Sequence, residues 1–587
     1  MINVLDRIDS PSDLKKLSMD ELNLLADDVR YAMLNRLSKF GGHFGPNLGV
    51  VEITIALHYV FDSPVDRIVY DVSHQCYPHK ILTGRSKGFL DEDWFKKISG
   101  YTNPDESEHD VFKVGHTSTS ISLATGLCVG RDLLGKKHNI IAVIGDGSLS
   151  GGEAMEGLDF AGEYDKNLII VVNDNDMSIA ENHGGIYENL KKLRNSDGKA
   201  EDNWFKGFSL DYRYVDDGHD IAKLVEAFKS VKDIDHPVVV HVKTTKGKGY
   251  ALAEKLKEQW HYCASFDLET GKAYSVDSSE SYTSLTRAYL TDKLDSDDSV
   301  CVITSATPTL MGFDRDLRDR YKGRFIDVGI AEEDAVAMAS GIAKAGAKPV
   351  YGVYATFLQR TYDQILQDVC INKSPVTVLV FSGSIYGMKD ITHIGYYDVA
   401  MLSHIPGLVY LAPSYYEEYA AMADWAIAQK DHPVFIRVPG GKVLHSDEAF
   451  ETDYSELNKA KVYKRGSEVA LVGVGPFVEI AMSVSEELKK SGIDATVISP
   501  RYLTGIDEEL FDSLKKDHKA VVTIEDGLRN GGYGESVSAY YGDSDMRTYS
   551  FGYEKEFLDR YDPKAMLEQY GINNNTITKK VLTLLEK

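Results

Sequence analysis

Short, uninterrupted runs of Val, Ile and other apolar residues constrain the fold of this chain more than any other feature. Such runs occur at residues 140–144, 168–172, 238–242, 299–303, 376–380, 469–472 and 520–524. A run that is apolar at every position is typical of a strand buried on both faces, and helix-like segments separate these runs. Alternation of strands and helices indicates parallel sheets that helices cover. The sequence therefore predicts an α/β protein in which this arrangement is repeated.

Two polar stretches that lack strand patterns predict where domains meet. They lie at residues 275–283 and 447–459. A chain of 587 residues is long enough for about three to five domains. We expect three, and they span residues 1–279, 280–455 and 456–587.

Charge and cysteine content exclude several classes of function. The chain has 65 Lys and Arg against 90 Asp and Glu, a net charge of −25, so binding to nucleic acid or to an anionic membrane is not expected. We find no apolar run of about 18 residues that would predict a membrane-spanning helix. The five cysteines stand far apart without a C-x-x-C pair, which favours a reducing compartment, so we expect a cytoplasmic protein.

Two short motifs close two successive predicted strands. Gly145, Asp146 and Gly147 directly follow the run at 140–144, and the run at 168–172 leads into an Asn-Asp-Asn segment that ends at Asn175. Each motif alone is usually a turn. Ligands bind at the carboxyl ends of parallel strands, however, and a carboxylate with an amide oxygen suits Mg²⁺ that also binds phosphate. Together the motifs predict a site for a metal ion and a diphosphate.

This pair resembles the signature of thiamine-diphosphate enzymes, in which the Asp and the last Asn hold the Mg²⁺ of the cofactor. Longer motifs are similar to those of the 1-deoxy-D-xylulose-5-phosphate synthase family, a branch of the transketolase superfamily. They lie at residues 41–52, 70–85, 115–120, 329–332 and 354–364, and the resemblance runs from about residue 8 to the C-terminus. The metal motif precedes Glu332, which is the transketolase-type order and disfavours the pyruvate decarboxylase and acetolactate synthase families.

The resemblance implies a fold, a reaction and partners. The fold is three parallel-sheet α/β domains of transketolase type: the diphosphate-binding domain at 1–279, the pyrimidine-binding domain at 280–455 and the C-terminal domain at 456–587. The implied transferase condenses pyruvate with D-glyceraldehyde 3-phosphate, loses CO₂ and forms 1-deoxy-D-xylulose 5-phosphate, which feeds isoprenoid, thiamine and pyridoxal synthesis. Its cofactors are thiamine diphosphate and Mg²⁺, and it is a homodimer.

Roles for individual residues also follow from the resemblance. Glu332 matches the glutamate that bonds the aminopyrimidine; the alternative is a surface helix start, which the surrounding motif disfavours. Phe357 matches a ring that stacks on the pyrimidine, although it could be an ordinary core aromatic. The implied catalytic residues are Glu332, His43, His74, His261 and His393. The implied cofactor contacts are His74, Gly115, His116, Thr117, Gly147, Ser148, Asn175, Tyr250, Glu332 and Phe357. The implied metal ligands are Asp146, Asn175 and the backbone carbonyl of Met177, and the substrate contacts are Tyr354, Arg360, Asp390 and Arg437.

Other histidines and one glycine motif have simpler interpretations. We expect His79, His219 and His404 to be structural. Residues 472–476 resemble the start of a dinucleotide fingerprint, but Val478 stands where the third glycine should be. We expect a strand, a turn and a helix there, without a nucleotide.

The chain departs from the family where the acceptor phosphate is bound. One arginine of that clamp is absent from the segment before His393, and Gly440 replaces the other. The segment 195–207 is also shorter than usual. One hypothesis keeps the synthase activity and assigns binding of the acceptor phosphate to Tyr354, Arg437, Lys389 or Lys442. Alternatively, the chain is a divergent carboligase or transketolase-like enzyme that uses a different aldehyde. A binding protein without catalysis is disfavoured by Glu332 and the metal pair.

Overall fold

The structure is a computed structural model that describes residues 4–275 and 279–586, and it divides into two compact units. The first contains the described residues up to 275 together with Gly329–Ala331, and the second contains residues 279–328 and 332–586. The predicted boundary near residue 279 adjoins residues 276–278, which lie outside the described residues. The predicted boundary at 455/456 falls inside the second unit, so the three-domain division stays a prediction.

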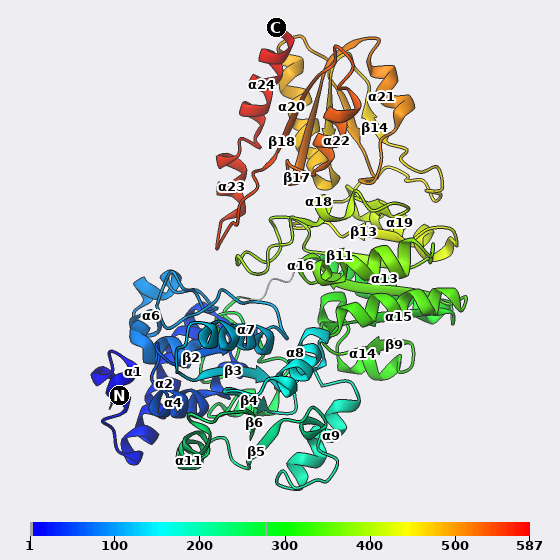
Figure 1. Cartoon of the computed structure of the whole chain (residues 1–587). Helices are drawn as coiled ribbons and strands as arrows, with labels where there is room; N and C mark the ends of the chain where they lie inside the picture. Colours follow the sequence, from blue (N-terminus) through cyan, green and yellow to red (C-terminus); the bar gives the residue numbers. More distant parts are fainter. Residues whose placement is uncertain (1–3, 276–278, 587) are drawn as a thin grey trace. The chain divides into compact units, whose positions relative to one another are not determined.

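The first unit is built around a parallel five-stranded sheet (Figure 1). Its strands, in spatial order, are β2 (Arg67–Tyr70), β3 (Ile140–Gly145), β4 (Leu168–Asp174), β6 (Pro237–Lys243) and β5 (Asp211–Val215). A separate antiparallel pair joins β1 (Gly42–His43) to β7 (Tyr262–Cys263).

Alternate residues of each strand face opposite layers of helices. Ile141 and Val143 of β3 lie in one buried cluster with α2 (Met19–Phe40), α4 (Val51–Val60) and α11 (Ile221–Val231). Ile140, Ala142 and Ile144 lie in the other cluster. The helices of that second layer are α7 (Ser120–Leu133), α8 (Gly152–Glu163) and α9 (Gly185–Asn195). Burial on both faces explains why β3 is apolar at every position.

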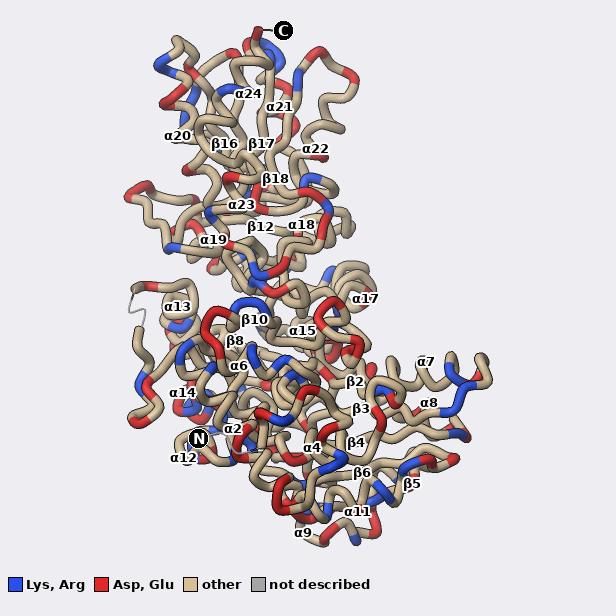
Figure 2. The backbone as a smooth tube through the Cα atoms, turned by 90° about the vertical axis from the view of Figure 1, so that its left-hand side faces the viewer, with Lys and Arg blue, Asp and Glu red and all other residues tan. Residues whose placement is uncertain are grey.

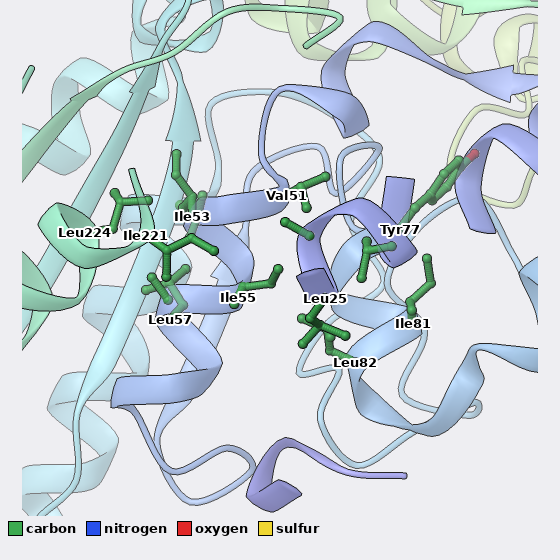
Figure 3. Packing of buried hydrophobic residues seen from close by; sticks show 14 of the residues in the cluster. Leu25, Val51, Ile53, Ile55, Leu57, Tyr77, Ile81, Leu82, Ile221 and Leu224 are labelled. Atoms are coloured by element: carbon green, nitrogen blue, oxygen red, sulfur yellow. The ribbon is translucent and has the colours of Figure 1, made fainter. Parts of the chain in front are cut away.

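The packing of α11 on α4 illustrates this core. Figure 3 shows Ile221 and Leu224 of α11 beside Ile53 and Leu57 of α4. The two leucines and Ile53 have no exposed surface, and Ile221 has almost none. Each such side chain stabilises the fold by about 1.5–3 kcal/mol through burial.

The second unit contains two sheets. The first has six parallel strands: β12 (Val409–Leu411), β13 (Val434–Arg437), β11 (Thr377–Phe381), β10 (Lys348–Tyr354), β8 (Val300–Thr304) and β9 (Phe325–Asp327). Helix α15 (Glu332–Lys344) packs on one face. Helices α13 (Tyr282–Ser296) and α19 (Tyr416–Ala428) pack on the other.

The second sheet of this unit has five strands: β14 (Lys461–Lys464), β16 (Thr496–Ser499), β15 (Glu468–Gly473), β17 (His518–Leu528) and β18 (Arg547–Tyr553). Only β14 runs antiparallel to its neighbour among these described strands. Helices α21 (Glu508–Leu514) and α22 (Tyr533–Tyr540) cover one face, and α20 (Val478–Lys490) and α24 (Asn574–Glu586) cover the other. One hydrophobic cluster contains residues of both sheets, which explains why they form one compact unit.

The α/β prediction is confirmed, because every predicted apolar run lies in or overlaps a strand: β3, β4, β6, β8, β11, β15 and β17. The strand, turn and helix expected around residues 472–478 are also present, as β15, a short turn and α20. Acidic and basic residues are scattered along the backbone of both units (Figure 2). Among the described residues, no helix has the length and apolar character needed to cross a membrane.

Candidate active site

The carboxyl ends of β3 and β4 bring the two predicted metal motifs together. The strands are parallel neighbours, and Gly145 pairs with Asn173. Asp146 begins a short 3-10 helix (Asp146–Ser150) directly after β3, while Asn175 directly follows β4. The predicted proximity of the motifs at one edge of the sheet is therefore confirmed.

The Asp146 carboxylate lies buried inside the loop that follows β4. It accepts hydrogen bonds from the Asn182 side-chain amide at 2.6 Å, from the Met177 backbone N–H at 3.1 Å and from the Asn175 N–H at 3.4 Å. Burial, with the nearby carboxylate of Asp174, raises the pKa of Asp146 to about 8. A negative charge here is therefore costly without a compensating cation.

Several buried oxygens beside Asp146 are unsatisfied. Asn175 Oδ1, Asn182 Oδ1 and Ser178 Oγ are buried and have no hydrogen-bond partner among the described residues. Such atoms require an explanation, and a bound ion is one. The described residues contain no group of three or more His, Cys, Asp or Glu side chains that could hold a metal. A cation here would therefore depend on amide and carbonyl oxygens as well as Asp146, a set that fits Mg²⁺.

The loop with Gly147 and Ser148 is held close to its neighbours. A Cβ atom at Gly147 would lie 2.9 Å from the Cα of Ser178, so only glycine fits. Ser118 donates its hydroxyl to the Ser148 carbonyl at 2.8 Å, and the buried Asp71 carboxylate accepts from the Ser118 N–H at 2.9 Å. The predicted cofactor contacts Gly115, His116 and Thr117 lie just before Ser118, in the segment that leads into α7.

Three of the predicted histidines form a cluster in the first unit. The ring of His43 lies 4.9 Å from that of His74 and 5.6 Å from that of His261, and His74 and His261 stack at 5.3 Å. Pairing of β1 with β7 brings His43 opposite Tyr262, next to His261. Burial, with His74 and Lys246 nearby, lowers the pKa values of His43 and His261 well below the usual range. Neutral rings can accept or donate a proton.

Lys246 is a residue of this region that sequence reasoning missed. It is 1% exposed, and its ammonium donates to the carbonyl of Ser178 at 2.6 Å and, more weakly, to that of Ile179 at 3.4 Å. Burial lowers its pKa to about 7. In the sequence it stands in a Lys-Gly-Lys-Gly segment typical of a surface turn, and the only signal is its position three residues after the end of the buried strand β6.

Tyr250 packs in a group of aromatic residues. It is half-buried, its hydroxyl donates to the Leu268 carbonyl at 3.0 Å, and its ring packs among Phe44, Trp260 and Phe266. These contacts do not involve the metal motifs, so the predicted contact of Tyr250 with the cofactor stays a prediction.

Two histidines of this unit that we expect to be structural, His79 and His219, contact other residues of the protein. His79 is buried between the ring of His58 and the carboxylate of Asp110, at 2.8 Å from each. His219 joins the Glu52 carboxylate to the backbone N–H of Thr245 and so fixes the turn that carries Lys246.

In the second unit, Glu332 stands at the first position of α15. Although three acidic residues open this helix, Glu332 is only 3% exposed, so the surface interpretation is wrong for it. Burial raises its pKa to about 7, and the nearby Arg360 partly opposes that rise, with its NH1 atom 3.7 Å from Glu332 Oε2.

The end of β10 and the loop after β11 hold further predicted residues. The Tyr354 ring lies 5.6 Å from that of Phe357, and the Phe357 ring lies 5.8 Å from that of His393. Thr392 links His393 to Asp390, with its hydroxyl 2.8 Å from His393 Nδ1 and 3.2 Å from Asp390 Oδ1. Burial, together with Asp559, raises the pKa of Asp390 to about 6.

Arg437 is engaged within the protein, which argues against its predicted substrate role. Its Nε donates to Asp398 at 2.7 Å, one terminal nitrogen donates to Asp526, and the other donates to the Gly383 carbonyl and to Asp398. The side chain is 5% exposed. Because all three nitrogens have partners, Arg437 offers no free fork for a phosphate.

Family models match most of the chain. A model described as 1-deoxy-D-xylulose-5-phosphate synthase matches residues 5–204 and 198–244, the transketolase pyrimidine-binding domain matches 280–443, and the transketolase C-terminal domain matches 458–577. These matches confirm the predicted transketolase-type fold.

Full-length relatives agree with these models. The chain is 37% identical to 1-deoxy-D-xylulose-5-phosphate synthase of Clostridium beijerinckii over 627 residues, which cover 100% of both chains. It is 37% identical to the protein of the same name from Caldanaerobacter subterraneus over 621 residues, 99% of each. Among solved structures, the transketolase of Leishmania mexicana is 16% identical with a TM-score of 0.46, over 97% of this chain and 98% of that one.

Proposed function

Because the chain belongs to the 1-deoxy-D-xylulose-5-phosphate synthase family, we propose that it condenses pyruvate with D-glyceraldehyde 3-phosphate. The products are 1-deoxy-D-xylulose 5-phosphate and CO₂, and one proton is taken up. The observation that carries the proposal is the buried Glu332 carboxyl, whose pKa of about 7 suits proton exchange near neutral pH.

The family indicates thiamine diphosphate as the cofactor, which when bound supplies a centre that stabilises carbanions. Mg²⁺ would be held by the Asp146 carboxylate, the Asn175 amide oxygen and the backbone carbonyl of Met177. The buried, unpartnered Asn175 oxygen supports this assignment. Gly115, His116, Thr117, Gly147 and Ser148 would then bind the diphosphate through the loops described above, and Tyr250 would be a further cofactor contact.

Glu332 would hold a proton against the aminopyrimidine nitrogen, because burial favours its neutral form. Phe357 would stack on the pyrimidine ring and exclude water from it. Arg360 would keep Glu332 from becoming still more basic, since its positive charge opposes the effect of burial.

Proton delivery to the substrate oxygens falls to the histidines. The residues proposed for this role are His43, His74, His261 and His393. The low pKa values of His43 and His261 keep those rings neutral at physiological pH. Tyr354, Arg360 and Asp390 would orient the substrates.

Identification of the products tests this proposal. Purified protein would be incubated with pyruvate, Mg²⁺, thiamine diphosphate and a panel of aldehydes, and the products analysed by mass spectrometry. The proposal requires 1-deoxy-D-xylulose 5-phosphate from D-glyceraldehyde 3-phosphate; absence of any product from pyruvate would refute it.

A second candidate function is a carboligase that uses another aldehyde acceptor. Two observations favour it: each nitrogen of Arg437 already donates within the protein, and a Cβ atom at Gly440 would lie 2.5 Å from Ser384 Oγ, so Ser384 occupies the space beside this glycine. Lys389 and Lys442 are exposed and would be the remaining cations for a phosphate. Steady-state kinetics with D-glyceraldehyde 3-phosphate and with D-glyceraldehyde separate the two functions, because equal kcat/KM values would exclude a phosphate-selective acceptor site.

The proposal includes a homodimer. A groove of about 320 Å³ runs between α7 and α8, lined in part by Gly126, Val129 and Phe160. Leu133 at the end of α7 is 83% exposed and Phe160 of α8 is 53% exposed. Large apolar side chains that are exposed together are typical of a protein–protein interface. A second copy of the chain is the occupant we propose. The proposal also includes the cytoplasm, where the separate thiols would stay reduced.

A further inference from the structure

One guanidinium holds the residues on both sides of Asn175. We propose that Arg194 is a positioning residue for the cation site: it fixes Asp174 and Asp176 and thereby the turn that carries the Asn175 amide oxygen. This inference rests on the Mg²⁺ site of the proposed function and adds to it a residue that lies outside the ligand set.

The contacts of Arg194 are short and directional. It lies in the last turn of α9, and its NH1 atom is 2.7 Å and 2.8 Å from the two carboxylate oxygens of Asp174. Its NH2 atom is 2.6 Å from Asp176 Oδ1. Side-chain exposure is 10% for Arg194 and zero for Asp174, so the inner ion pair is shielded from water. A planar fork makes these contacts in a geometry that lysine cannot reproduce.

Asp174 is also fixed from the sheet. His241 Nε2 lies 2.8 Å from its carboxylate, and the Tyr212 hydroxyl lies 2.8 Å from His241 Nδ1. Asp174 and His241 are fully buried. Asp174 is therefore held in place from the sheet. Arg194 binds both Asp174 and Asp176, and so fixes the exposed side of the turn relative to Asp174.

The turn itself is strained, which explains why it needs a clamp. Asp176 has a φ angle of +62°, a left-handed conformation that costs about 1 kcal/mol or more for a residue other than glycine. Its backbone N–H donates to Asp174 Oδ1 at 3.2 Å, and its side chain is held by Arg194. Asn175 lies between these two fixed residues, with its N–H directed at Asp146. Relaxation of the turn would move the Asn175 oxygen away from the Asp146 carboxylate.

The segment after Arg194 reinforces the clamp. The Arg194 carbonyl accepts from the Tyr214 hydroxyl at 3.4 Å, and the Gly198 N–H donates to the Leu193 carbonyl at 2.8 Å. The short segment 195–207 thus folds back compactly on the end of α9, which keeps the guanidinium in place.

Charge and geometry predict opposite effects, so two substitutions distinguish them. If Arg194 acted only through its charge, R194Q would bind Mg²⁺ more tightly, because a repelling cation is lost, and R194K would resemble the wild type. If Arg194 positions the turn, both R194K and R194Q weaken Mg²⁺ binding. Loss of a residue that orients metal ligands typically lowers metal affinity by about 10–100-fold.

The experiment measures binding without substrate. Calorimetric titration of Mg²⁺ into the full-length protein with thiamine diphosphate present gives the apparent Kd for Mg²⁺. We expect R194K and R194Q to raise it by about 10–100-fold, with kcat at saturating Mg²⁺ changed by less than about threefold. K192Q is the matched control: Lys192 lies on the same helix and pairs with the exposed Asp202 at 2.6 Å, so its Kd should equal that of the wild type.

An unchanged or lower Kd in both Arg194 variants would overturn the inference. If those variants do not fold, D176A decides the question, because Asp176 is 61% exposed and removal of its side chain breaks only the outer contact. A rise in Kd in D176A supports the clamp, and an unchanged value overturns it. If instead the wild type shows no Mg²⁺-dependent binding of thiamine diphosphate, the proposed function fails rather than the role of Arg194.

Discussion

The Nε atom of Arg437 lies 2.7 Å from Oδ2 of Asp398, and both side chains are buried. Asp526 accepts a second hydrogen bond from the same guanidinium. One buried cation therefore compensates two buried carboxylates, and its role is to stabilise the second unit rather than to bind an anion.

We predict that R437M destabilises the protein strongly. Breaking a buried ion pair by removing one partner costs about 3–5 kcal/mol, since the remaining carboxylates lose their compensation. Thermal unfolding followed by circular dichroism should show a lower midpoint for the transition of this unit. R529M is the control, because Arg529 pairs with Glu554 at a more exposed site and should change the midpoint little. Equal midpoints for the two variants would contradict this role.

Position 440 tests whether the chain has lost a phosphate contact. The double variant S384G/G440R removes the hydroxyl that would clash with a side chain at 440 and introduces a guanidinium. If this position faces the acceptor, kcat/KM for D-glyceraldehyde 3-phosphate should rise about 10–100-fold relative to that for D-glyceraldehyde, because a hydrogen bond to a charged group contributes about 1.5–3 kcal/mol. S384G alone is the control. The same change for both aldehydes would show that position 440 does not contact the phosphate.

The parts of the fold that could be predicted are those with local signals. Strand β3 is apolar at every position because helices cover both faces of its sheet, and that pattern is visible in one segment of sequence. Asp146 and Asn175 were found for a related reason: each follows such a strand, and parallel strands end at the same edge of the sheet.

The features that the sequence could not show depend on contacts between distant segments. Arg437 is 39 residues from Asp398 and 89 residues from Asp526, so nothing near it in the sequence indicates that its charge is compensated. Lys246 and Asn182 contact residues of the predicted metal site, and no periodic sequence pattern indicates these contacts. The burial of Glu332 could not be predicted either. Three acidic residues at a helix start are typical of a surface, yet Glu332 is buried in the folded chain.

The exposed apolar face of α7 and α8 predicts an effect on oligomeric state. A Cβ atom at Gly126 would meet no atom within 4 Å, so G126R leaves the isolated fold unstrained and fills the groove. We expect the wild type to have the mass of a dimer in light scattering and G126R to have the mass of a monomer at the same concentration. K192Q should remain dimeric. A dimeric G126R protein would exclude this face as the interface.

Glu332 gives the most direct test of the proposed chemistry. E332Q keeps the shape of the side chain but cannot exchange a proton, so kcat should fall by about 10²–10⁴-fold. Binding of thiamine diphosphate should change much less, because the proposed metal and diphosphate contacts are unaltered. Single-turnover measurements with pyruvate at saturating cofactor would give the rate. E332Q or E332A with full carboligase activity would refute the assignment.

The same variant has a signature in stability that does not depend on catalysis. Burial raises the pKa of Glu332 from 4.5 to about 7, so the folded protein binds this proton more tightly than the unfolded chain does. The resulting stability is fully present below pH 4.5 and is lost as pH rises through 7. The wild type therefore loses up to about 3 kcal/mol in the free energy of unfolding between pH 5 and pH 8 through this group. E332Q has no such group, so its free energy of unfolding should rise by that amount relative to the wild type over the same range. Denaturant titrations of the cofactor-free proteins at both pH values measure the difference; a difference that does not depend on pH would mean that Glu332 is ionised in the folded protein as it is in the unfolded chain.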